Sequence, residues 1–242
     1  MSSVQDHYDN LLAGVYIWMS GGFEPSRQRY ANFFRKARLA PQGTALAVDL
    51  GAGPGFQSLP LADLGYRVLA IDTSRALLNE LNARKQQRDI EVVCDDMMNF
   101  PAHLSWRAHL IVCMTDTLLH LGSKPEVDTL FQYCANALQS GGRLVLTFRD
   151  LSRELQGTDR FFQVRSDESR IFSCFVEYQP DHVLVHDLIY TRIGGDWQLS
   201  RSAYRKLRLG RDECVESLRN VGFDIASYRV DHGMVTLIAR KP

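Results

Sequence analysis

A glycine-rich segment offers the first chemistry in this chain. Gly51-Ala52-Gly53-Pro54-Gly55 follows a short apolar run and precedes a helical pattern. Glycines let a backbone turn sharply and approach a bound molecule closely. The dinucleotide-binding pattern GxGxxG would need glycine where Phe56 stands. Asp49 precedes the loop, and its carboxylate would repel a diphosphate but suits a ligand that carries an ammonium or a sulfonium.

Acidic residues also end the next two expected strands. Asp72 is placed to accept hydrogen bonds from a ribose diol, although a role at the start of the following helix is the alternative. Asp95 and Asp96 come next, followed by Met97. One of these two carboxylates could bind an adenine amino group, and the thioether could cover the ring. The choice between Asp95 and Asp96 stays open, and the motif register favours Asp96.

Four ordered motifs carry a family resemblance. VDLGAGPG, AIDTS, CDDM and LQSGGRLVL resemble the class I S-adenosylmethionine-dependent methyltransferases, well over about 40–150 and loosely over 211–240. The resemblance implies S-adenosylmethionine as cofactor, which agrees with a ligand of adenine, ribose and a cationic tail without phosphate. It implies that Asp49, Gly51 and Gly53 hold the methionine part, Asp72 the ribose, and Asp96 and Met97 the adenine. Ala52, Thr73 and Met114 complete the expected cofactor contacts in this region.

A narrower similarity concerns the start of the chain. YDNLLAGVYIWMSGGF, VCMTDTLLHL and a hairpin insert before the last helix look like small stand-alone bacterial methyltransferases. In that group, aromatic residues of the first helix fold over the cofactor, which implies this role for Tyr8, Tyr16 and Trp18. Ordinary core packing explains the same aromatic stripe equally well.

His120 is the candidate catalytic residue. It lies just past the fourth expected strand, at the sheet edge where doubly wound folds bind ligands. A histidine there could take a proton from an amine or hydroxyl of the acceptor. A hydrogen-bonded structural histidine is the alternative. Asp116 could orient a substrate or cap a helix.

Two further clusters have simpler explanations. His182 and His186 lie four residues apart on an expected strand, too far apart to share one ion, so no metal site is expected. Basic residues gather near Tyr204 and indicate either a solvated strand edge or a clamp for an anionic substrate. These basic residues are Arg201, Arg205, Lys206, Arg208 and Arg211.

The elements that must position these residues alternate between strand and helix from 45 to 150. Strands that are apolar on both faces and separated by helices predict a parallel sheet covered on both sides. The expected fold class is α/β, a doubly wound, mainly parallel seven-stranded sheet with an antiparallel last strand. Its first five strands are expected at 45–50, 67–71, 91–94, 109–114 and 143–148, and its helices at 57–64, 75–84 and 125–138.

Segments outside this repeat predict two additions. Helical spacing from Val4 to Met19, stopped by Gly21-Gly22, and a second helix opening at Pro25 predict an N-terminal helical cap over 1–40. Period-two segments over 161–208 predict an antiparallel β meander, which we expect to form a substrate lid at 151–209. The cofactor-binding domain would then comprise 41–150 and 210–242, closed by a helix at 212–220 and strands at 223–230 and 234–239.

Composition excludes several classes of protein. The 242 residues are 45% hydrophobic, and 28 Lys+Arg balance 28 Asp+Glu, so the broad basic field of a nucleic-acid binder is not expected. No apolar run reaches the roughly 18–20 residues that span a bilayer, and the start lacks signal-peptide character. Five scattered cysteines without a CxxC motif indicate the reducing cytoplasm. The sequence leaves the oligomeric state open.

Taken together, these observations predict an enzyme. We expect an S-adenosylmethionine-dependent methyltransferase acting on an N or O atom of a small-molecule acceptor, with no nucleic-acid or membrane partner. The donor is already activated, so the protein mainly aligns the nucleophile and excludes water. A nicotinamide-dependent oxidoreductase and a non-catalytic cofactor-binding protein of the same fold are the alternatives.

Overall fold

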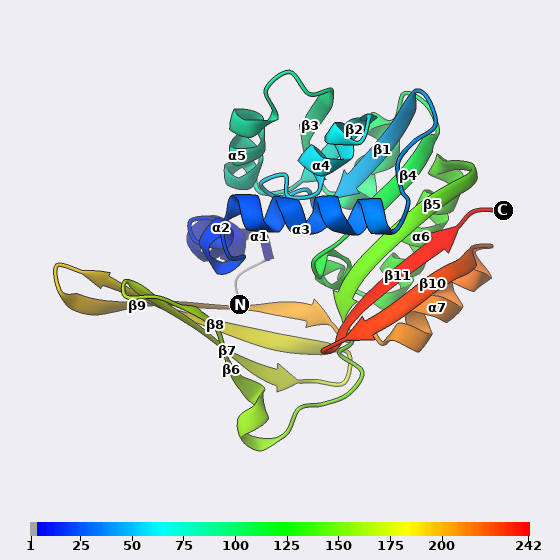
Figure 1. The fold of residues 1–242 in the computed structure, drawn as a ribbon. Helices are drawn as coiled ribbons and strands as arrows, with labels where there is room; N and C mark the ends of the chain where they lie inside the picture. Colours follow the sequence, from blue (N-terminus) through cyan, green and yellow to red (C-terminus); the bar gives the residue numbers. More distant parts are fainter. Residues whose placement is uncertain (1–3) are drawn as a thin grey trace.

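A seven-stranded sheet forms the centre of the molecule, as a computed structural model that describes residues 4–242 shows (Figure 1). Its strand order is β10-β11-β5-β4-β1-β2-β3, and β11 runs antiparallel to both of its neighbours. The predicted fold class is therefore confirmed. The strands are β1 (Ala45–Leu50), β2 (Tyr66–Asp72), β3 (Ile90–Cys94), β4 (Ala108–Cys113), β5 (Leu138–Arg149), β10 (Asp224–Asp231) and β11 (Met234–Arg240).

Helices cover both faces of this sheet, because the strands carry apolar side chains on both of their faces. In β1, Ala45 and Ala47 belong to one core cluster and Leu46 and Val48 to the other. The first cluster lies under α3 (Phe23–Lys36), α4 (Ser58–Asp63) and α5 (Arg75–Lys85). The second lies under α6 (Lys124–Ala137), α7 (Arg211–Asn220) and the short helix η2 (Met97–His103).

A separate antiparallel sheet lies beside the first, in the order β6-β7-β8-β9 (Figure 1). Its side facing the N-terminal helices carries a third core cluster, which includes Phe172, Val185 and Tyr204. The predicted antiparallel meander is therefore confirmed. The domain boundaries at 151 and 209 remain a prediction. The strands are β6 (Phe161–Ser166), β7 (Arg170–Tyr178), β8 (His182–Ile193) and β9 (Asp196–Leu207), preceded by η4 (Gly157–Arg160).

The N-terminal segment differs from the continuous helix expected between Val4 and Met19. It consists of α1 (Val4–His7), a π-helical turn η1 (Tyr8–Leu12) and α2 (Tyr16–Met19). Gly14 interrupts it, and glycine is a poor helix former. The two halves also pack in different places, since Leu12 joins the core of the second sheet while Tyr16 stacks on Phe56 of the main domain.

The sheet topology creates one place where a ligand can enter. β1 pairs in parallel with β2 on one side and with β4 on the other, so the order of the strands reverses at β1. In such sheets, ligands bind beyond the carboxyl ends of the strands. The glycine loop follows β1, and η3 (Thr117–His120) follows β4. Within residues 4–242, no helix is long and apolar enough to cross a membrane.

Candidate active site

Two cavities lie beyond the carboxyl ends of the central strands. The smaller, of about 260 Å³, is bounded by the glycine loop, the end of β2, residues 95–98 and the N-terminal helices. The larger, of about 830 Å³, lies between the N-terminal helices and the second sheet. The predicted residues that line the smaller cavity are Tyr8, Tyr16, Gly51, Gly53, Asp72, Thr73, Asp96, Met97 and His120.

Backbone hydrogen bonds pin the glycine loop to the end of β2. Gly51 N and Ala52 N both donate to Ile71 O, at 2.9 and 3.0 Å. Gly51 has φ +74°, and a Cβ there would come within 2.4 Å of the Thr117 side chain. Only glycine therefore fits this approach of the loop to η3. Sequence reasoning missed Thr117, and only its position just after β4 could have drawn attention to it.

Asp72 holds this loop and a helix together while facing the cavity. Its Oδ2 accepts from Gly53 N and its Oδ1 from Ser74 N, each at 2.8 Å. Burial raises the pKa of Asp72, and these backbone donors oppose the rise. Each carboxylate oxygen retains a second lone pair. Both readings of Asp72 are thus compatible, because the structural bonds leave acceptor capacity for ribose hydroxyls.

Asp95 and Asp96 have different surroundings at the far end of the same cavity. Asp95 accepts from Asn99 Nδ2 at 2.9 Å and from His103 Nε2 at 2.7 Å, and these hydrogen bonds lower its pKa to about 2. The side chain of Asp96 accepts only the backbone N–H of Met98, at 2.8 Å, within the described residues. Asp96 therefore has more acceptor capacity to offer, and its contact with adenine remains our prediction.

Asp49 does not lie where the sequence reasoning expected it. Its side chain points away from both cavities toward α4 and accepts from Ser58 Oγ at 2.5 Å. It is only 1% exposed, and burial raises its pKa to about 7. The reason is strand alternation: Asp49 shares the face of Ala45 and Ala47. Its side chain therefore lines neither cavity.

Three other expected contacts lie outside the smaller cavity. Ala52 and Met114 are buried in the core under α3 and α4. Trp18 packs on the second sheet, where its indole donates to Asp167. Two guanidinium groups, those of Arg165 and Arg170, each lie 5.7 Å from its ring. The structure thus places Trp18 as an anchor of α2 on the second sheet, whereas Tyr8 and Tyr16 face the cavity.

His120 stands where the two cavities meet. Tyr8, Tyr16 and His120 line both cavities. His120 Nε2 and Tyr8 Oη share a hydrogen bond of 3.3 Å, whose donor depends on the imidazole tautomer. Burial, aided by the nearby Lys206 charge, lowers the pKa of His120 to about 3, and its Nδ1 has no hydrogen-bond partner among the described residues. The ring is therefore neutral near pH 7 with one nitrogen unsatisfied.

The basic cluster near Tyr204 is divided among separate partners. Lys206 Nζ pairs with Asp116 Oδ2 at 2.6 Å, Arg208 with Glu154 at 2.8 Å, and Arg211 with Asp212 at 2.7 Å. Asp116 also accepts from Arg149 N, so it joins the main domain to β9 and makes no capping bond. Neighbouring cations lower its pKa against its burial. The clamp proposed from sequence is therefore not formed.

Comparisons with known proteins agree with this geometry. Residues 47–142 match a family profile described as a methyltransferase domain. The cypemycin N-terminal methyltransferase of a Streptomyces species is 30% identical over 103 residues, which are 43% of this chain and 41% of the relative. A ubiquinone biosynthesis O-methyltransferase of Xanthomonas axonopodis pv. citri is 29% identical over 51% of this chain and 48% of its own length. The chain thus spans about half the length, or less, of these curated relatives.

Solved structures resemble the chain over nearly its whole length. The CcbJ methyltransferase from Streptomyces caelestis superimposes with a TM-score of 0.81 and 18% identity, covering 100% of this chain and 99% of its own. CalS10, an amino pentose methyltransferase from Micromonospora echinaspora with bound S-adenosylmethionine, gives 0.74 and 18%, covering 90% and 92%. The match of residues 47–142 to the methyltransferase-domain profile confirms the resemblance that the sequence motifs indicated.

The buried Asp49 predicts a pH effect on stability. The pKa of Asp49 rises from 3.8 to about 7 on folding. The stabilisation that protonated Asp49 gives to the fold is therefore fully present below pH 4 and is lost as the pH rises through 7. Asp49→Asn cannot ionise and still accepts from Ser58. Between pH 5 and pH 8, the free energy of unfolding of wild type should therefore fall by about 2–3 kcal/mol more than that of the variant, as measured by urea titration at each pH. Asp224→Asn, on the surface, should behave like wild type, and equal pH slopes for Asp49→Asn and wild type would contradict the assignment.

Proposed function

We propose that this protein transfers a methyl group from S-adenosylmethionine to an N or O atom of a small molecule. The observation that carries the proposal is the meeting of two cavities at Tyr8, Tyr16 and His120. A donor in the smaller cavity and an acceptor in the larger would face each other there. Alignment of two reactants in a fixed geometry can lower a barrier by on the order of 7–11 kcal/mol.

The lining of the smaller cavity fits S-adenosylmethionine. Asp72, Asp95, Asp96 and Glu126 supply four carboxylates, and no Lys or Arg lines the cavity among the described residues. Such a lining suits hydroxyl, amino and cationic groups and would repel a diphosphate. Met97 and neighbouring apolar side chains can cover an adenine ring. This charge pattern favours the sulfonium cofactor over a nicotinamide dinucleotide.

A small acceptor is favoured by the position of the larger cavity and by the comparisons. The cavity lies beneath the N-terminal helices and is backed by the second sheet, so an extended duplex has no access to the meeting point through them. The similar proteins are named as N- and O-methyltransferases, one of them acting on an amino pentose.

We further propose a cytoplasmic location, where reducing conditions suit the five unpaired cysteines.

The chain's own residues would then have three tasks. S-adenosylmethionine, when bound, supplies an activated methyl group on a sulfonium. Tyr8 and Tyr16 would cover this position and exclude water, and burial raises the pKa of both hydroxyls, so they stay protonated. Neutral His120 would accept the hydrogen bond of the acceptor's N–H or O–H at an imidazole nitrogen. Asp72 would keep the glycine loop in place while it binds the ribose.

Calorimetry and a transfer assay test the proposal together. We expect S-adenosylhomocysteine to bind with one site per chain and NADH not to bind. Incubation with methyl-labelled donor should transfer label to one or more members of a panel of amines and alcohols, and to neither mixed RNA nor DNA. NADH binding would favour an oxidoreductase. Donor binding without transfer to any acceptor would favour a non-catalytic cofactor-binding protein.

Removal of the Asp72 carboxylate should weaken donor binding. We expect Asp72→Ala to reduce the binding free energy of S-adenosylhomocysteine by about 1.5–3 kcal/mol, since a hydrogen bond to a charged group is lost. Isothermal calorimetry measures this change. Glu91→Ala removes an exposed carboxylate outside the cavity and should bind like wild type. An unchanged Kd for Asp72→Ala would leave that residue a structural role alone.

Replacement of His120 should slow transfer more than it weakens donor binding. We expect His120→Gln to lower kcat about ten-fold, because the hydrogen bond by which the neutral imidazole orients the acceptor's N–H or O–H is lost. In wild type, the pKa of about 3 keeps this group neutral from pH 5 to 8, so it should cause no acid-side fall in rate over that range. His182→Gln is the control, because that ring lies outside both cavities. A kcat within three-fold of wild type would make His120 structural.

A further inference from the structure

A single carboxylate interrupts the apolar inner face of the second sheet. The inward side chains of β8 are Val183, Val185, Asp187 and Ile189, and Asp187 is only 2% exposed. It also lines the larger cavity. Burying an ionised carboxylate among apolar side chains is costly unless opposite charge or hydrogen bonds compensate it. The carboxylate of Asp187 therefore needs a compensating charge or hydrogen-bond donor at this position.

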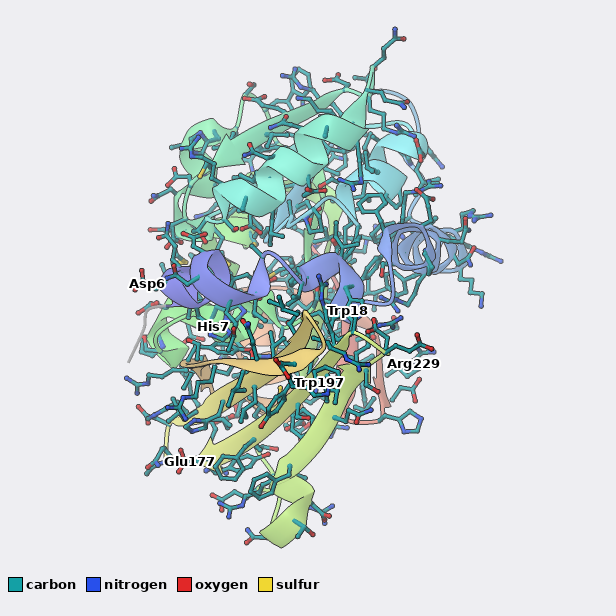
Figure 2. The ribbon with its side chains drawn as sticks, turned by 90° about the vertical axis from the view of Figure 1, so that its left-hand side faces the viewer. Asp6, His7, Trp18, Glu177, Trp197 and Arg229 are labelled. Carbon is teal, nitrogen blue, oxygen red and sulfur yellow. The ribbon has the colours of Figure 1, made fainter. Side chains whose placement is uncertain are left out.

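Two contacts with described residues satisfy part of the hydrogen-bonding capacity of Asp187. Cys174 Sγ donates to its Oδ1 at 2.8 Å, and His7 Nε2 donates to its Oδ2 at 2.9 Å. Figure 2 shows His7 pointing from the N-terminal helix toward this sheet. An ionised carboxylate accepts about four hydrogen bonds, so these two contacts use about half of its capacity. Asp187 can therefore bind a further donor without losing either contact.

The cations near this end of the cavity are already engaged elsewhere. Lys206 and Arg149 both pair with Asp116, at 2.6 and 3.4 Å. In the described part of the chain, His7 is the one basic side chain that pairs with Asp187. Five carboxylates and three Lys or Arg side chains line the larger cavity. Because Arg208 also pairs with Glu154, this surplus is small, and the cationic preference rests on Asp187, which pairs with no Lys or Arg among the described residues.

The remainder of the same wall is suited to an apolar body. Phe172, Val176 and Val185 line the cavity beside Asp187, and Leu12 faces them from the N-terminal segment. The volume of about 830 Å³ lies within the range of small-molecule sites. A ligand that combines an apolar body with one ammonium group would satisfy both parts of the wall.

We propose that the acceptor is an amphipathic amine whose ammonium group pairs with Asp187 while its apolar body lies on the inner face of the second sheet. An ammonium has no lone pair, so for transfer to this nitrogen one N–H proton first passes to the Asp187 carboxylate. This inference rests on the proposed function and names the acceptor class of its larger cavity. It assigns Asp187 as the residue that selects amines over alcohols and acids of the same shape. The competing reading is that Asp187 only holds His7, and hence the N-terminal helix, on the sheet.

Matched probes separate these readings. Phenylbutylamine, phenylbutanol and phenylpentanoate share one apolar body and differ in charge, and each is titrated calorimetrically into the full chain saturated with S-adenosylhomocysteine. We expect wild type to bind the amine about ten-fold or more tightly than the alcohol, as a hydrogen bond to a charged group predicts. Asp187→Asn retains acceptor and donor groups near His7 and should bind both equally. Asp159→Asn removes another carboxylate that lines the same cavity and should keep the preference.

Several outcomes would overturn the inference. These are equal binding of amine and alcohol by wild type, tighter binding of the acid, no binding of any probe, or an unchanged preference in Asp187→Asn. If that variant does not fold, the comparison of the three probes on wild type decides alone. The saturation step is measured first, so failure of S-adenosylhomocysteine to bind refutes the proposed function itself and is distinguishable from failure of the amine preference.

Discussion

The hydrogen bond from Gly53 N to the Asp72 carboxylate is the interaction on which the rest of the site depends. It ties the loop after β1 to the end of β2, and the second oxygen of the same carboxylate binds Ser74 N at the start of α5. Three separate segments thus meet at one side chain, at the sheet position where ligands enter. A substituent on Gly51 would break this arrangement by colliding with Thr117. The small cavity exists because these backbones approach so closely.

The N-terminal segment contributes side chains to both cavities of the site. Its apolar residues, Leu12 among them, pack into the second sheet, while Tyr8 and Tyr16 look toward the glycine loop and His120. One short segment therefore forms the roof of the smaller cavity and a wall of the larger one. The break around Gly14, between the π-helical turn and α2, makes this possible, because a straight helix would present its aromatic residues along a single stripe.

The electrostatic character of both cavities follows from how their charged residues are paired. Asp116, Lys206 and Arg149 neutralise one another across the boundary between the two sheets. The carboxylates of the smaller cavity have no Lys or Arg beside them in the described lining, and Asp187 of the larger cavity pairs with a histidine. Cationic groups are therefore favoured on both sides of His120, which itself is kept neutral by burial.

The sequence by itself determined the alternation of strands and helices, the antiparallel meander and many of the residues that line the smaller cavity, because strand alternation, glycine spacing and strand-end carboxylates are local signals. Asp72 and the glycines were recognisable for that reason. Tertiary structure alone decided that Asp49 turns toward Ser58, that Trp18 anchors on Asp167, and that Asp187 faces the larger cavity. Those placements depend on which face of a strand or helix meets which neighbour. Pairing between residues 180 positions apart, as in His7 and Asp187, leaves no local pattern to read.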